Sequence, residues 1–230
     1  MSEDKSLDLL GVKPVADALK TVTEKSMTGI GALLSRICLP AAEELGLYFQ
    51  DKVKQFRSRN TARIVEKTDK LLNIEDDEFK LKALPRLVHE ILENGSWCDD
   101  ETLQDMWAGL LASSCTLDGK DDSNLLFIDI LSKLTIVQVK IINYSCLNAQ
   151  STSLFEPLDE ILVNLEDLTE ITGVKDRYRL DRELDHLRSI GFFAIDGGFF
   201  TEKTVLTANI TPTSLCLHFF MQCNGGSMPV

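Results

Sequence analysis

The chain has 230 residues, of which 44% are hydrophobic and 26% are charged, and its formal net charge is −12. This composition is that of a soluble globular protein and excludes wholesale disorder. The acidic balance disfavours non-specific binding to nucleic acid or anionic lipid, and the length supports one large domain or two small ones.

The first forty residues show neither a signal peptide nor a membrane span. Acids open the chain where a signal peptide would be basic, and Arg36 interrupts the longest apolar run, 27–40. We expect no transmembrane segment and a cytoplasmic location. Residues 1–40 are predicted to form a helical or flexible segment, whose Gly29 and Gly31 permit close helix contacts or mark a break.

A long amphipathic helix is predicted from residue 40 to residue 72, with Phe56 and Ile64 on its apolar stripe. Between Asp51 and Lys70 it carries seven Lys/Arg but only three Asp/Glu. At about 100° per residue these cations fall on both flanks of the stripe, whereas a helix that binds nucleic acid gathers them on one side. We therefore expect them to face acidic helices of the same chain or of a second copy. The candidate partner-binding residues of this helix are Arg57, Arg59, Asn60 and Arg63.

Asn60 falls on the apolar stripe itself. A polar residue there sets the register of helix pairing or marks a local bend. The first alternative predicts a homo-oligomer that self-associates through residues 45–72.

The rest of the first half, within a helical domain at 41–122, contains acidic and amphipathic stretches. Acids at 99–101 precede an apolar series, so they complement the N-terminus of a helix. The amphipathic helix before them is predicted to end at Asn94 and Gly95 with a left-handed glycine cap.

No catalytic motif is found in the chain, which has only three histidines and six widely spaced cysteines. A nucleophile elbow, a P-loop and the zinc-protease motif are all missing. We therefore expect a protein that is not an enzyme, with no cofactor, no metal and reduced thiols.

Residues 123–230 predict a small α+β domain. Its expected elements are helices at 123–135 and 136–148, a short helix Leu165–Thr172 ending at Gly173, a longer helix from about Asp176 to Ile190, a hairpin around 196–198, and a closing helix with Thr211 as its N-cap and Pro212 in its first turn. This order is typical of a winged helix–turn–helix. The predicted fold class is therefore mainly α, with an N-terminal helical part followed by a small α+β winged-helix-like C-terminal part.

The longer helix of this domain presents Tyr178, Arg182 and His186 as candidate partner-binding residues. Acids at 181, 183 and 185 would lie among the phosphates of a bound nucleic acid. We therefore expect a protein partner. A DNA- or RNA-binding regulator and a membrane-surface effector that uses Gly29 and Gly31 stay as alternatives.

Four stretches match the pattern of a known family. They are AAEELGLYFQDKVKQFRSRN, DDETLQDMWAGLLASS, FIDILSKLTIVQVKII and TPTSLCLHFFMQC. Through them the chain resembles the abortive infection alpha family of bacterial proteins, although Ser214 stands where relatives tend to have glycine. The resemblance implies a cytoplasmic protein of phage defence and brings no catalytic residues. Together these patterns predict a non-enzymatic interaction module with a protein partner, such as a phage component.

Overall fold

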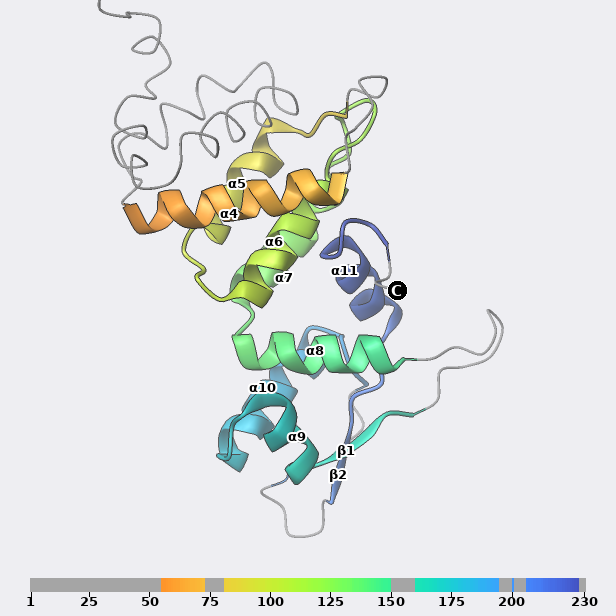
Figure 1. Ribbon diagram of the computed structural model, residues 1–230. Helices are drawn as coiled ribbons and strands as arrows, with labels where there is room; N and C mark the ends of the chain where they lie inside the picture. The colour runs from red at the N-terminus through yellow and green to blue at the C-terminus, as the bar shows by residue number, and fades with distance from the viewer. Residues whose placement is uncertain (1–54, 73–80, 150–159, 195–199, 201–205, 228–230) are drawn as a thin grey trace, which may run out of the picture. The chain divides into compact units, whose positions relative to one another are not determined.

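The computed structural model describes residues 55–72, 81–149, 160–194, 200 and 206–227 (Figure 1). Within them, contacts define two compact units. The first runs to Ser132 and also includes Gln222–Ser227, and the second comprises Lys133–Met221. The units divide near the C-terminal end of α7 (Leu125–Lys133), whereas the boundary predicted at residue 122 precedes this helix. The predicted segment 1–40 lies outside the described residues.

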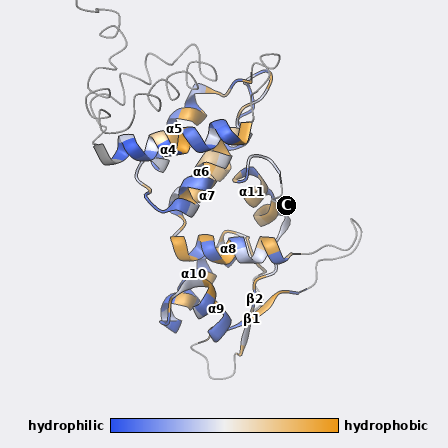
Figure 2. Cartoon of the chain, in the orientation of Figure 1, coloured by the Kyte–Doolittle hydropathy of each residue, from blue (hydrophilic) through white to orange (hydrophobic). Residues whose placement is uncertain are grey.

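Three helices build the core of the first unit: α4 (Gln55–Leu72), α5 (Pro85–Gly95) and α6 (Glu101–Ser113). Hydrophilic and hydrophobic residues alternate along the ribbon of α4, as expected for a helix with one buried side (Figure 2). That side packs against α6, which also contacts α5. Ile64 and Trp107 are fully buried there, which confirms the predicted position of Ile64 on the apolar stripe.

The sequence predicted the N-terminal end of α6 correctly but not the C-terminal end of α5. Asp100 caps α6 as expected, because its carboxylate accepts from the Leu103 backbone N–H at 3.1 Å. The left-handed cap predicted at Gly95 is wrong, since Gly95 ends α5 and Ser96 follows in the right-handed region. Gly95 is instead required for packing: a Cβ there would lie 2.7 Å from Ile64 Cδ1 and 3.0 Å from Trp107 Cγ.

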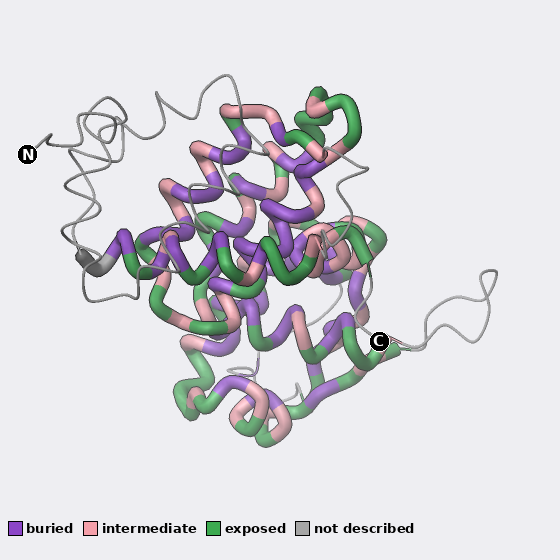
Figure 3. The backbone as a smooth tube through the Cα atoms, turned by 45° about the horizontal axis from the view of Figure 1, so that its top comes forward, coloured by how far each residue is buried: buried purple, intermediate pink, exposed green. Residues whose placement is uncertain are grey.

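The second unit is mainly helical, with one small sheet. Its elements are α8 (Ile136–Asn148), β1 (Leu162–Asn164), α9 (Leu165–Thr172), α10 (Arg177–Ser189), β2 (Thr207–Asn209) and α11 (Ser214–Gln222), of which Gln222 belongs to the first unit. α8 contacts both α9 and α10, and buried positions recur along these helices (Figure 3). The predicted fold class, mainly α with a small C-terminal α+β part, is confirmed.

Local signals predicted the pair of helices α9 and α10 closely. α9 ends at Thr172 because Gly173 adopts a left-handed φ of 77°, which a glycine reaches without strain. α10 is capped by Asp176, whose carboxylate accepts from the Tyr178 N–H, and ends before Ile190. Both boundaries agree with the prediction to within one residue.

The sheet pairs different segments from those predicted. β2 lies antiparallel to β1, with Val163 opposite Ala208, and β1 was not predicted as a strand. The turn of the predicted hairpin lies in residues 195–199 and 201–205, which are outside the described residues. The winged helix–turn–helix therefore stays a prediction. None of the described helices combines the length and the apolar character that a membrane crossing needs.

Candidate interaction surfaces

Arg57, on α4, is enclosed within the first unit and is only 3% exposed. Its Nε donates to Ser96 Oγ at 2.8 Å, and its Nη2 lies 2.7 Å from Glu93 Oε2. The guanidinium also stacks on the ring of Trp97, with 4.3 Å between Cζ and the ring centroid. Arg57 therefore joins α4 to the end of α5, and it positions other residues rather than reaching a partner itself.

Asn60 is fully buried one turn further along α4. Its Nδ2 donates to the backbone oxygen of Ser96 at 3.0 Å, and its Oδ1 accepts from Gln104 Nε2 at 3.3 Å. Gln104 Nε2 also donates to the backbone oxygen of Cys98 at 2.9 Å. The polar residue on the stripe therefore fixes how α4 meets α5 and α6 of its own chain, and its side chain is not on the surface.

Trp97 follows directly after Ser96, to which both Arg57 and Asn60 donate hydrogen bonds, and it is 60% exposed. Two exposed acidic side chains follow it closely in the sequence: Asp99 is exposed, and the Glu101 side chain is 87% exposed. We refer to Arg57, Asn60, Ser96, Trp97, Asp99 and Glu101 as the Trp97 corner. It combines an exposed aromatic ring with a backbone that buried hydrogen bonds hold in place.

Burial and the neighbouring acids both disfavour ionisation of the Cys98 thiol. Burial is the largest cause that raises the pKa of the Cys98 thiol, and the charges of Asp99 and Asp100 raise it further. A thiol resists ionisation where neighbouring charges are negative.

Among the residues that the structure describes, three of the five cations of α4 form ion pairs, one of which, Lys70 with Glu66, lies within the helix itself. Arg57 pairs with Glu93, and Lys67 pairs with Glu101 at 3.6 Å and with Asp105. The prediction that cations of this helix meet acids of the same chain is thereby confirmed for these two. Arg59 and Arg63 are exposed and form no ion pair among the described residues, so they stay available to a partner.

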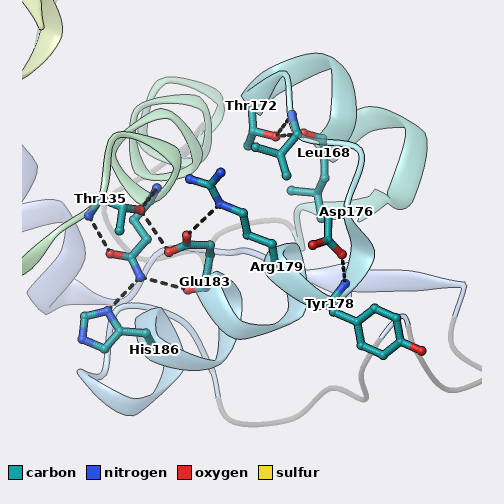
Figure 4. Close-up of polar contacts among 10 residues, drawn as sticks. Thr135, Leu168, Thr172, Asp176, Tyr178, Arg179, Glu183 and His186 are labelled. Atoms are coloured by element: carbon teal, nitrogen blue, oxygen red, sulfur yellow. Dashed lines mark hydrogen bonds and ion pairs between the residues drawn. The ribbon is translucent and has the colours of Figure 1, made fainter.

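The following sites belong to the second unit, where Glu183 fixes α10 to the start of α8 (Figure 4). Glu183 is 5% exposed, and its Oε2 accepts from Thr135 Oγ1 at 2.9 Å. Its Oε1 lies 3.4 Å from Arg179 Nε, and its backbone oxygen accepts from Gln138 Nε2 at 3.4 Å. Both carboxylate oxygens of Glu183 therefore bind side chains of the protein itself.

His186 lies half-buried on the same side of α10. Its Nδ1 is 2.8 Å from Gln138 Nε2. The Gln138 amide is oriented by its other end, because Oε1 accepts from the Thr135 N–H at 3.0 Å in a capping box. Nε2 must therefore be the donor, which leaves His186 Nδ1 as the acceptor and fixes the ring tautomer. Structural bonds thus occupy this predicted site residue.

Tyr178, Arg182 and Asp185 form the α10 outer face, a name we use for these three exposed residues. Tyr178 is 70% exposed, and its ring points away from the Glu183 cluster (Figure 4). The expectation that acids at 181 and 183 lie among the phosphates of a ligand is wrong, because Asp181 is 6% exposed and Glu183 is 5% exposed. Only Asp185 shares the exposed side with Tyr178 and Arg182.

The residues that sequence reasoning missed are Ser96, Trp97 and Glu93. One signal was present. A large aromatic residue stands in a polar connection, between the glycine that ends α5 and the acids that begin α6. A tryptophan in such a place either turns inward to fill a core or remains on the surface as a contact residue.

Comparison with known proteins places the chain in a family. The sequence model of the family described as abortive infection alpha matches residues 50–213, which is more than half of the chain. The chain therefore belongs to the abortive infection alpha family, as its sequence resemblance indicated. No curated protein and no solved structure matches the chain.

Proposed function

We propose that this member of the abortive infection alpha family is a non-enzymatic protein-interaction module that acts in bacterial defence against phage. The observation that carries the proposal is the Trp97 corner. A tryptophan that is 60% exposed lies on a backbone fixed by two buried side chains. Tryptophan is enriched among the few residues that supply most of the binding energy in protein interfaces.

Preorganisation strengthens this interpretation. Binding costs free energy when side chains and loops become ordered, and a contact residue that is already held in place avoids part of that cost. Arg57 stacks on one face of the Trp97 ring, and Asn60 holds the preceding peptide. These contacts do not bury Trp97, which remains 60% exposed, so their effect is to fix the position of an exposed ring.

The titratable residues of the second unit support the non-enzymatic part of the proposal. Asp181 and Glu183 are buried carboxylates that would be candidates for acid–base chemistry, but Asp181 Oδ1 accepts from the Phe200 N–H, and Thr135 and Arg179 bind the oxygens of Glu183. His186 Nδ1 is likewise held by Gln138. A general base must be within hydrogen-bond reach of a substrate proton. The hydrogen bonds of these groups are instead made within the protein, where they hold α10 in place.

The proposal includes self-association, with a changed contact surface. Within the described part of α4, the stripe expected to pair with a second copy is covered by α5 and α6, and Asn60 is buried. A second copy would therefore meet the opposite strip, where Arg59 and Arg63 are exposed. Exposed charges of this kind contribute more to the specificity of an interface than to its affinity, since each exposed ion pair contributes only about 0–1 kcal/mol of binding free energy.

A second candidate function, contact with nucleic acid, is favoured by one observation. Because Asp181 and Glu183 are buried, the exposed residues of α10 include two arginines, Arg177 and Arg182, but a single acid, Asp185. Binding to mixed genomic DNA at low salt, lost on raising the salt and weakened by Arg182→Glu, would establish it. Absence of binding at low salt removes it.

Phage challenge of a bacterial host that expresses the full chain tests the main proposal. The wild-type chain is expected to lower the plaque count of at least one phage in a panel, and Trp97→Ala is expected to lose this protection. Leu117→Ala is the matched control, because Leu117 is 65% exposed outside the Trp97 corner. Protection by Trp97→Ala equal to that of the wild type, or no protection by the wild type, contradicts the proposal.

A further inference from the structure

We propose that the outer face of the Trp97 ring binds a cationic side chain, an arginine or a lysine, of the protein partner. The inference rests on the proposed function and names the chemistry of the residue that docks there. It is carried by the stacking of Arg57 on one face of the ring, which leaves the opposite, outer face for a partner, by the 60% exposure of Trp97, and by the exposed acids that follow at positions 99 and 101.

The ring is already set up for cation binding. A guanidinium 4.3 Å from the ring centroid is attracted to the negative face of the indole, and tryptophan is the best of the aromatic residues for this interaction. A second cation on the opposite face meets the same negative charge distribution. Arg57 does not repel it as an isolated charge would, because Glu93 Oε2 lies 2.7 Å from the Arg57 Nη2 and compensates its charge.

The acids of the Trp97 corner select a cation over an apolar side chain. Asp99 is exposed and forms no ion pair among the described residues, and Glu101 has only Lys67, at 3.6 Å. An apolar partner that covered the ring would remove water from these carboxylates without replacing it, which costs free energy. An arginine or lysine side chain covers the ring with its stem and places its charge near the acids.

The α10 outer face does not show the same preference. It combines Arg182 with Asp185 around Tyr178, so its exposed charges are of both signs. At the Trp97 corner, by contrast, the exposed charged residues, Asp99 and Glu101, are both negative. The charges of Asp99 and Asp100 are also among the causes that raise the pKa of the Cys98 thiol. Charge complementarity therefore indicates a basic segment of the partner for this corner.

Peptides that differ only in charge test the inference on the full chain. The probe is a fluorescently labelled hexa-arginine peptide, and the comparison is hexa-citrulline, which has nearly the same shape but no charge. Binding is followed by fluorescence anisotropy at low ionic strength. We expect hexa-arginine to bind the wild type at least tenfold more tightly than hexa-citrulline.

Variants then separate the corner from the general attraction of an acidic protein for a basic peptide. Trp97→Leu keeps an apolar side chain but removes the aromatic ring, and it is expected to weaken hexa-arginine binding by about 2- to 30-fold, with Trp97→Phe in between. The pair Asp99→Asn and Glu101→Gln is expected to weaken it more than the pair Asp121→Asn and Asp122→Asn. Both pairs remove two exposed negative charges.

Two results overturn the inference: hexa-arginine binding that is equal in Trp97→Leu and wild type, or equal losses in the two carboxylate pairs. The outcome is independent of the phage test. Loss of protection by Trp97→Ala together with binding that does not depend on Trp97 would leave the proposed function in place with a partner of other chemistry. Peptide binding that depends on Trp97 together with intact protection by Trp97→Ala would refute the proposed function alone.

Discussion

Replacement of Arg57 by methionine tests whether the buried polar bonds of the first unit position Trp97. Methionine retains the length and apolar character of the arginine stem, so that packing is largely preserved. The change removes the donor to Ser96 Oγ, the partner of Glu93 and the cation beneath the Trp97 ring. It also removes the weaker bond from Arg57 Nη2 to the Glu93 backbone oxygen at 3.4 Å.

The expected loss can be assembled from the first three of these contacts. A buried hydrogen bond from a charged donor contributes about 1.5–3 kcal/mol. The ion pair adds little, about 0–1 kcal/mol, because the Glu93 side chain is 28% exposed and solvent screens its charge. A cation on an exposed ring contributes about 0.5–1 kcal/mol. After allowance for the ordering of the side chain, Arg57→Met should destabilise the first unit by about 2–4 kcal/mol.

Urea unfolding followed by tryptophan emission measures this loss in the relevant unit. The chain has two tryptophans, Trp97 and Trp107, and both belong to the first unit. With a urea dependence of about 2 kcal/mol per M, the midpoint should fall by about 1–2 M. Quenching of Trp97 by acrylamide should increase, because one face of the ring is uncovered.

The control is Arg59→Met, which changes an exposed arginine two residues away and should shift the free energy of unfolding by less than about 0.5 kcal/mol. A midpoint for Arg57→Met equal to that of Arg59→Met would refute the reasoning. Unchanged quenching of Trp97 would show that the guanidinium does not position the ring.

Three further changes probe the packing and the buried charges. Gly109→Ala places a Cβ against the backbone oxygen of Cys223 and should lower the stability of the first unit by about 3 kcal/mol; wild-type stability would contradict this contact. Arg188→Met should not destabilise the second unit, because Arg188 is 5% exposed and its Nε and Nη2 have no hydrogen-bond partner among the described residues. Unfolding followed by circular dichroism measures this, and a loss of more than about 1 kcal/mol in the free energy of unfolding would contradict it. Burial raises the pKa of the Cys223 thiol, so only the unfolded chain ionises it above about pH 8.5, and stability should fall by up to about 1.4 kcal/mol per pH unit. Cys223→Ala should lose that part of the pH dependence.

The helices could be predicted where their ends are decided within a few residues of sequence. Asp100 and Gly173 are such positions, since a cap depends on the hydrogen bonds and the φ angle of its own turn. Gly95 shows the limit. Asn-Gly after an amphipathic helix indicates a left-handed cap, but the glycine is required by Ile64 and Trp107, which lie far from it in sequence. The strand β1 was missed for the same reason, because three residues carry little pattern and only pairing with β2 makes them a strand.

Sequence reasoning selected Arg57 and Asn60 of the candidate site, but it missed Trp97 and the positioning roles of the two selected residues. Helical periodicity placed Arg57 and Asn60 beside and on the apolar stripe of α4, and both are buried there. Their partner, Ser96, lies 39 and 36 residues away, so no local pattern could reveal that both side chains hold one connection. Charge counting likewise placed Asp181 and Glu183 on the surface of α10, where burial has removed them. A count of charges cannot tell which side of a helix each of them occupies.

The aromatic ring and the acids of the Trp97 corner should act on different steps of binding. Exposed charges act over the screening distance of about 8 Å at physiological salt and so change how often a partner arrives in the right orientation. A ring acts only after contact, and most effects of contact residues are on dissociation. Removal of Asp99 and Glu101 charges should therefore lower the association rate and its salt dependence, while Trp97→Leu should raise the dissociation rate at nearly constant association. Equal changes of both rates in the two variants would mean that the ring and its acids do not form one docking site.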